Sequence, residues 1–199
     1  MDCALLSRVG KPWLAAVVSR GLPCAGNGFA VALELTSLLG SVELLAWGKH
    51  NGCPWNQRTC ALAAWGGHLA VLHWARENGC PWDAYTCWYA AQNGHLDVLQ
   101  WAREHHCPWD PWTCAAAARG GHLAVLAWAR EHHCRWTKMT CEWAASGGQL
   151  EALRWARDHG CPWDHQTCAA AARAGHLDVL RWVREHDCPW TSSTLYIGR

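Results

Sequence analysis

The chain has 199 residues, 51% of them hydrophobic, which is enough to bury a core as one domain or one short array. Its 17 Lys and Arg nearly balance its 16 Asp and Glu, and the formal net charge is +1. Proteins that bind phosphate backbones or anionic membranes usually carry dense positive charge, whereas this chain has no cluster of basic residues. Nucleic-acid binding is therefore not favoured. Membrane spanning is not favoured either, because the sequence lacks the roughly 18 consecutive apolar residues that a spanning helix needs.

The first residues, 1–25, precede the patterned part of the chain. Their apolar run, from Trp13 to Val18, is short for a secretory signal and lacks a basic head and a small-residue cleavage site. We expect residues 1–25 to be an N-terminal segment that caps the rest, and we expect an intracellular protein. The 13 Cys are an odd number and too sparse for a disulfide scaffold, which favours reduced thiols.

A period of 27 residues organises the remainder of the chain. Cys and Trp each recur at this step in two series, and the four series stay in phase. One Cys series is Cys53, Cys80, Cys107, Cys134, Cys161 and Cys188, and the other is Cys60, Cys87, Cys114, Cys141 and Cys168. The period predicts a repeat array over residues 26–199. It has a degenerate unit at 26–52, full units at 53–79, 80–106, 107–133, 134–160 and 161–187, and a partial unit at 188–199.

Each unit has the pattern of two short helices, which we call helix A and helix B. In the unit 80–106, Thr86 has the side chain of an N-cap and precedes a stripe of small residues, so it predicts the start of helix A. Gly94 ends that helix, and helix B covers residues 95–104. Gly79 and Pro81 mark the unit boundary. Neither helix is long enough to be stable alone, so the pattern predicts an all-α solenoid of stacked pairs.

Two segments, 90–99 and 171–180, read Ala-Ala-x-x-Gly-His-Leu-x-Val-Leu and resemble the centre of ankyrin repeats. The resemblance extends over residues 40–199. An ankyrin repeat has 33 residues, and the residues missing here fall between Cys80 and Thr86, which implies that the long β-hairpins are absent. With their Cys-Pro-Trp connectors, the units also resemble arrays of giant DNA viruses and some protists. The resemblance implies a non-enzymatic scaffold that binds a protein.

Zinc is the sharpest chemical alternative, because Cys53, Cys60 and His68 are of ligand type and recur along the chain. Their spacing matches no compact zinc finger, and Gln149 replaces the His in one unit. Equivalent Cys on stacked helices would lie about 8 to 10 Å apart, too far to share an ion or a disulfide. We therefore expect buried thiols, structural His, no metal and no cofactor. A zinc-dependent or nucleic-acid-binding module stays the alternative, and a truncated repeat fragment without an independent role is a further one.

An active site would need a group of catalytic side chains that occurs once and does not follow the 27-residue repeat. The sequence contains no such group, so we expect no catalytic residues. Positions that repeat hold the fold, whereas positions that vary are free to recognise a partner. Large side chains occupy several variable positions of helix A, and we expect them to form a binding surface on the concave face. The alternative is that they pack on neighbouring units. The predicted partner-binding residues are Tyr85, Trp88, Tyr89, Trp112, Met139 and Trp143.

Overall fold

The computed structural model describes residues 40–50, 52 and 54–190, and within them the regular elements are all helices. The expected cap at 1–25, the first half of the degenerate unit and residues 191–199 of the partial unit lie outside the described residues. The B helices are α4 (Val42–His50), α6 (Leu69–Glu77), α8 (Leu96–Glu104), α10 (Leu123–Glu131), α12 (Leu150–Asp158) and α14 (Leu177–Glu185). The A helices are α5 (Gln57–Trp65), α7 (Ala84–Gln92), α9 (Pro111–Gly120), α11 (Lys138–Ser146) and α13 (His165–Ala174).

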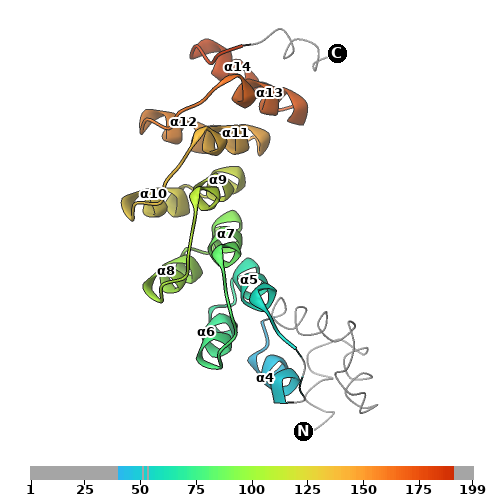
Figure 1. Ribbon diagram of the computed structural model, residues 1–199. Coiled ribbons are helices and arrows are strands. Elements are labelled where there is room, and N and C mark those ends of the chain that lie inside the picture. Colours follow the sequence, from blue (N-terminus) through green and yellow to red (C-terminus); the bar gives the residue numbers. More distant parts are fainter. Residues whose placement is uncertain (1–39, 51, 53, 191–199) are drawn as a thin grey trace.

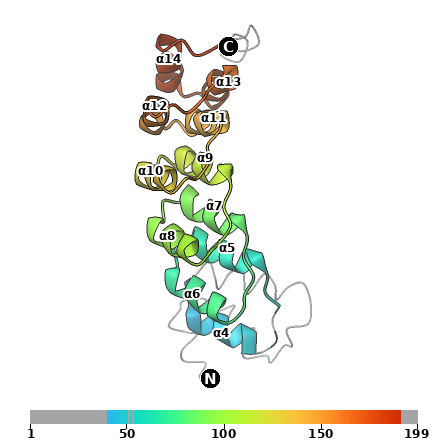
Figure 2. The same ribbon diagram turned by 60° about the vertical axis from the view of Figure 1, so that its left-hand side comes forward.

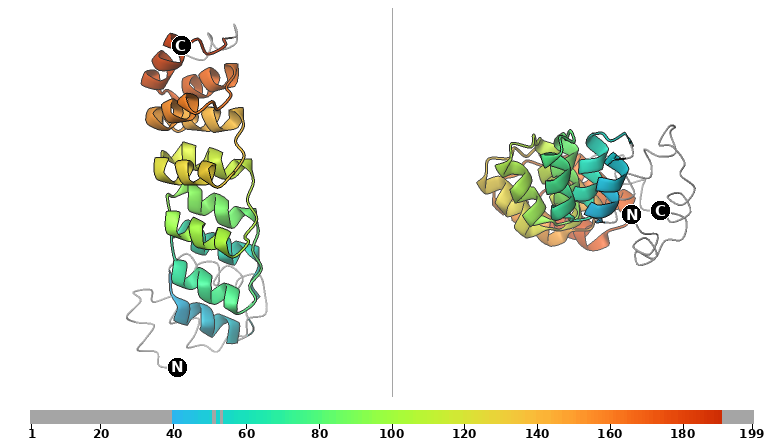
Figure 3. Two further views of the ribbon diagram at one scale, coloured as in Figure 1. Left: turned by 90° about the vertical axis from the view of Figure 1, so that its left-hand side faces the viewer. Right: turned by 90° about the horizontal axis from the view of Figure 1, so that it is seen from below.

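The helices form antiparallel pairs that stack into an elongated array, with the A helices in one column and the B helices in another (Figures 1 and 2). Contacts are dense between successive A helices and sparse between successive B helices. The array therefore curves, with the A column on the inner side in Figure 1 and the pairs rotating progressively along the stack in Figure 3. The prediction of an all-α repeat solenoid is confirmed. None of the described helices has the length and apolarity to cross a membrane.

The start of helix A differs from the expectation. In α7 the cap is Asp83, whose side chain accepts a hydrogen bond from the backbone N–H of Tyr85. Thr86 lies in the first turn of the helix and is fully buried, so the prediction that it caps the helix is wrong. The helix begins three residues earlier because an Asp carboxylate satisfies the free amides of the first turn. Equivalent caps begin the other A helices, namely Asn56, Asp110, Thr137 and Asp164.

Glycine ends both helices of a unit where the sequence predicted it. Gly94 has a φ of +78° between α7 and α8, and Gly79 has a φ of +80° after α6. This left-handed conformation is strained for residues with a Cβ atom. At positions equivalent to Gly79, His106 and His133 nevertheless adopt a φ of 64°. A side chain is thus tolerated at the unit boundary, whereas the inter-helix turn keeps Gly in every described unit.

The core lies between the two columns and continues through the stack. The B helices α4 to α12 each give it a fully buried Leu at the same place in the unit, as Leu72, Leu99 and Leu126 show, whereas the equivalent Leu180 of α14 is half-buried. Each A helix gives it Ala and Cys, whose small side chains let successive A helices approach closely. No unit buries this surface without its neighbours, so stability comes from the interfaces between units.

The buried Cys are paired within this core. The thiol of Cys107 donates to the backbone carbonyl of Asp83 over 3.4 Å, which places it at the first turn of α7, where it hydrogen-bonds with Cys87. This hydrogen bond and burial raise the pKa of the Cys87 thiol far above its ordinary value. The same partnership joins Cys60 to Cys80, Cys114 to Cys134, Cys141 to Cys161 and Cys168 to Cys188. The sequence reasoning compared only equivalent positions and missed these pairs, which join the two Cys series.

The Cys87 thiol should resist alkylation in the folded protein. A raised pKa keeps the thiol protonated at pH 8, and burial excludes the reagent. Iodoacetamide labelling of the full chain, mapped by mass spectrometry, should modify Cys87 only after denaturant is added. Labelling of Cys87 in native buffer at the rate of free cysteine would contradict the prediction.

Candidate functional site

The Trp residues that repeat along the chain belong to the scaffold. The guanidinium of Arg103, near the end of α8, lies 4.4 Å from the ring centroid of Trp109 and donates a hydrogen bond to the carbonyl of Cys107. Trp109 also contacts Trp128 of α10 edge to face, with centroids 6.0 Å apart. The same arrangement recurs around Trp82, Trp136 and Trp163. These contacts fasten each connector to the B helices on both sides of it.

The His of the inter-helix turn also holds units together. The Nε2 atom of His122 lies 3.1 Å from the carbonyl oxygen of Gln92, in the last turn of the preceding A helix. His95 contacts Trp65 and His176 contacts Ser146 in the same manner. A carbonyl oxygen only accepts hydrogen bonds, so Nε2 carries the proton. The His thus donates to a carbonyl at the C-terminal end of the preceding A helix, which has no partner within that helix. The structural role predicted for these His residues fits this geometry.

The structure does not gather the ligand-type residues into a metal centre. Among residues 40–50, 52 and 54–190, no three His, Cys, Asp or Glu side chains come together as possible ligands of one ion. The thiol of Cys87 hydrogen-bonds with that of Cys107, and both cysteines are free, while the ring of His95 is directed at the carbonyl of Trp65 in the preceding unit. Cys53, which the zinc hypothesis included, lies outside the described residues.

The predicted aromatic residues, in contrast, lie together. Trp88 contacts Tyr89 with ring centroids 4.6 Å apart, and Tyr85 contacts Trp88 at 6.3 Å. Trp88 of α7 also meets Trp143 of α11 at 6.4 Å, and Trp143 meets Trp112 of α9 at 5.3 Å. Five of the six predicted residues thus form one connected cluster, which we call the aromatic cluster. The sixth, Met139, is half-buried in the first turn of α11 and does not line the cleft described next.

Small residues on the middle helix make this cluster possible. At the positions where α7 has Trp88 and Tyr89, α9 has Ala115 and Ala116, which are almost completely buried. Their methyl groups leave space above α9, and the rings of Trp88 and Trp143 meet there from the helices on either side. The sequence of α9 therefore determines that aromatic side chains from non-adjacent units come into contact.

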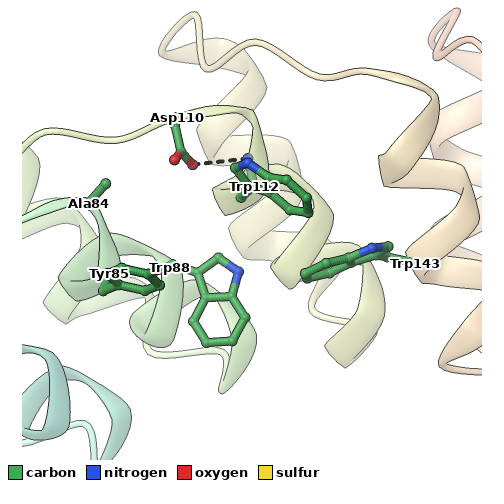
Figure 4. A pocket seen from close by; sticks show the side chains of 6 residues that line it. All are labelled: Ala84, Tyr85, Trp88, Asp110, Trp112 and Trp143. Atoms are coloured by element: carbon green, nitrogen blue, oxygen red, sulfur yellow. Dashed lines mark hydrogen bonds between the residues drawn. The ribbon is translucent and has the colours of Figure 1, made fainter.

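A cleft of about 330 Å³ opens beside the aromatic cluster, and Figure 4 shows it from close by. Tyr85 is 62% exposed and Trp112 43% exposed, whereas Trp88 and Trp143 are half-buried against the core. Packing on neighbouring units, the alternative to binding, thus describes Trp88 and Trp143, and in part Trp112, which contacts Trp143 but stays 43% exposed. Tyr85 contacts aromatic rings of its own helix and is the most exposed of the four. The residues that line the cleft are Ala84, Tyr85, Trp88, Asp110, Trp112 and Trp143.

Two lining residues, Ala84 and Asp110, were not predicted. Asp110 is the cap of α9, and its Oδ1 atom accepts from the backbone N–H of Trp112 over 3.0 Å. Since Asp recurs at this position, as Asp83 and Asp164, the sequence gave no sign of a further role for Asp110. Ala84 is the first residue of α7, a position that varies between units. That variation is the signal that could have identified it.

A second hollow of about 290 Å³ lies between α5 and α7, on the other side of Tyr85. Tyr89 and Leu62 line it together with two charged residues, Arg58 and Asp83. Tyr85 borders both hollows, so they form one irregular surface along the inner column. Five of the six predicted binding residues, all except Met139, are thus located on a hollowed and partly charged surface of the A helices.

Comparison with known proteins identifies the fold. No known family signature matches the sequence, and no curated protein matches it in sequence. Among solved structures, the ankyrin repeat domain of human ASB11 is similar, with a TM-score of 0.60 and 16% identity over 78% of this chain and 83% of that one. At this level of identity the similarity concerns the fold. The chain therefore has the ankyrin repeat fold, built here from short helix pairs.

Proposed function

We propose that this chain is a non-enzymatic scaffold that binds a protein segment in the cleft beside the aromatic cluster. The observation that carries the proposal is the gathering of four unrepeated aromatic side chains, Tyr85, Trp88, Trp112 and Trp143, around one cleft. The residues that repeat account for the scaffold, and these four do not repeat. Trp and Tyr dominate binding energy in protein interfaces when they surround a pocket. Ankyrin repeat folds generally mediate protein–protein interactions, which supports the same function.

The inner position of the cleft supports a segment rather than a flat surface as the partner. The curve of the array brings Trp88 and Trp143 together across α9, so the cleft is concave and extends over three A helices. Tyr85 and Trp112, the two exposed rings, line it (Figure 4). An extended peptide or a protruding loop can enter such a space and bury both rings.

Peptide selection tests this function without a known partner. Peptides from a random library, selected on the immobilised full chain, should lose at least about tenfold in affinity for the Tyr85→Ala, Trp112→Ala double variant, because both side chains are exposed at the cleft. Circular dichroism should show unchanged helical content. The matched control is Leu177→Ala, which removes a 70% exposed side chain on α14 and should leave affinity unchanged. Selected peptides that bind the double variant as well as the natural chain would refute the proposal.

A further inference from the structure

An ion pair between Lys138 and Asp164 shows how a helix-capping carboxylate of this chain can bind an ammonium group. Lys138, the first residue of α11, donates from Nζ to Oδ2 of Asp164, the cap of α13, over 2.6 Å. The Oδ1 atom of the same carboxylate accepts from the backbone N–H of Gln166. The cap thus uses one oxygen for its helix and offers the other to an ammonium group from the preceding A helix.

The same two positions, two units earlier in the sequence, are Ala84 and Asp110. Asp110 again uses Oδ1 for its helix, accepting from the N–H of Trp112. Its second oxygen has no lysine opposite, because Ala84 stands where Lys138 stands in the later unit. Both residues line the cleft, and Figure 4 shows the carboxylate between Ala84 and Trp112. Lys138 therefore supplies the ammonium group that contacts Asp164, whereas no lysine of the preceding A helix contacts Asp110 at the equivalent position.

The aromatic walls favour the same kind of group. The faces of Trp and Tyr rings attract cations, most strongly where water is partly excluded. Tyr85 and Trp88 meet at 80°, and Trp88 and Trp143 at 83°, so the cleft offers ring faces in different directions. Trp143 already has the guanidinium of Arg119 5.6 Å from its centroid. Asp110 is the charged group among the six lining residues, so the cleft presents a negative carboxylate beside the ring of Trp112.

We propose that the cleft recognises the ammonium group of a lysine on the partner segment, with Asp110 as its acceptor and the rings of Tyr85, Trp88 and Trp112 around its methylene chain and head. The inference rests on the proposed function, because it names the chemistry of the segment that enters the same cleft. The aliphatic chain of lysine packs on aromatic rings while its head reaches the carboxylate. Lys138 is the model for this contact within the chain.

The test uses the ¹⁵N-labelled full chain and two short peptides, Ac-Gly-Ser-Lys-Ser-Gly-NH₂ and the same peptide with norleucine in place of lysine. Norleucine keeps the hydrocarbon chain and removes the ammonium. The indole N–H signals of Trp88 and Trp112 should shift saturably with the lysine peptide, and affinity for the norleucine peptide should be at least about tenfold lower, as expected for a charge-assisted hydrogen bond.

Two matched substitutions locate the acceptor. Asp110→Asn keeps the helix cap, since Asn caps as well as Asp, and should lower affinity for the lysine peptide by about tenfold. Asp164→Asn makes the same change at the cap that Lys138 already occupies and should leave affinity unchanged. Equal binding of both peptides, an Asp110→Asn variant with unchanged affinity, or no shift with the lysine peptide would each overturn the inference.

An internal competitor gives a second test of the same position. Lys138 donates to the carboxylate of Asp164 from the preceding A helix. Ala84→Lys should therefore place an ammonium group beside the carboxylate of Asp110 and abolish binding of the lysine peptide. Ala84→Gln, which adds the uncharged residue found at equivalent position 57, should weaken binding much less. Unchanged affinity in the Ala84→Lys variant would show that the carboxylate is not placed to accept an ammonium group.

The outcomes separate this inference from the proposed function. If library peptides require Tyr85 and Trp112 but the norleucine and lysine peptides bind equally, the cleft binds an apolar segment and only the ammonium assignment fails. If library peptides bind without Tyr85 and Trp112, the cleft is not the binding surface and the proposed function itself fails.

Discussion

Replacing Gly94 with Ala should destabilise the protein by about 3 kcal/mol, because two separate costs add at this position. Gly94 has a φ of +78°, where a residue with a Cβ atom is strained by about 1–2 kcal/mol. A Cβ atom there would also lie 2.6 Å from Nδ1 of His122 in the next unit. The ring of His122 cannot move away freely, because its Nε2 atom is hydrogen-bonded to the carbonyl oxygen of Gln92. The free energy of unfolding, measured by urea titration, checks the loss.

The unit boundary offers a matched control for this substitution. Gly79 has a φ of +80°, but a Cβ atom there would meet nothing within 4 Å. Gly79→Ala should therefore cost only the backbone strain, about 1 kcal/mol, in keeping with the side chains that His106 and His133 carry at equivalent positions. Adding His122→Ala to Gly94→Ala should remove the steric part. Equal losses for Gly79→Ala and Gly94→Ala would show that the His ring does not restrict the turn.

Leu126→Ala should lower the free energy of unfolding by about 3–5 kcal/mol. Leu126 is fully buried in α10, at the middle of the stack, and belongs to the one core that runs through the array. Removing three carbon atoms there leaves a cavity between units, and neighbouring helices are anchored too firmly by their own core residues to close it. Chemical denaturation followed by circular dichroism measures the effect.

An exposed Leu is the control for this cavity. Leu177 begins α14 and is 70% exposed, so Leu177→Ala should change stability by no more than about 0.5 kcal/mol. If the two Leu substitutions had similar effects, the core between the columns would not be what stabilises the array.

The period of the sequence was sufficient to predict the fold. Gly94 recurs in step, and the structure places it in the turn between the two helices as expected. The start of helix A was predicted wrongly because Asp83 and Thr86 are both good caps by residue type. Only burial separates them, since Thr86 faces the core and cannot serve the helix end.

The candidate site could be predicted in part. Variation between units identified Tyr85, Trp88 and Trp112, since a side chain that differs from its counterparts is not needed by the scaffold. The contact between Trp88 and Trp143 could not be predicted, because the space that the small residues Ala115 and Ala116 leave for it is apparent only when the curvature of the stack is known. Asp110 was missed for a different reason: Asp recurs at this position of the unit, as Asp83 and Asp164, and residues that repeat were assigned to the scaffold.

The bridge from Trp88 to Trp143 has a consequence for how the array unfolds and bends. Repeat proteins ordinarily unfold as a row of units, each coupled only to the next one. Here a ring of the unit 80–106 touches a ring of the unit 134–160 across the unit between them. These three units should therefore open together as one cooperative block, while the ends fray separately. Straightening the array would separate the rings of Trp88 and Trp143. A segment bound in the cleft would therefore hold the array at its present curvature.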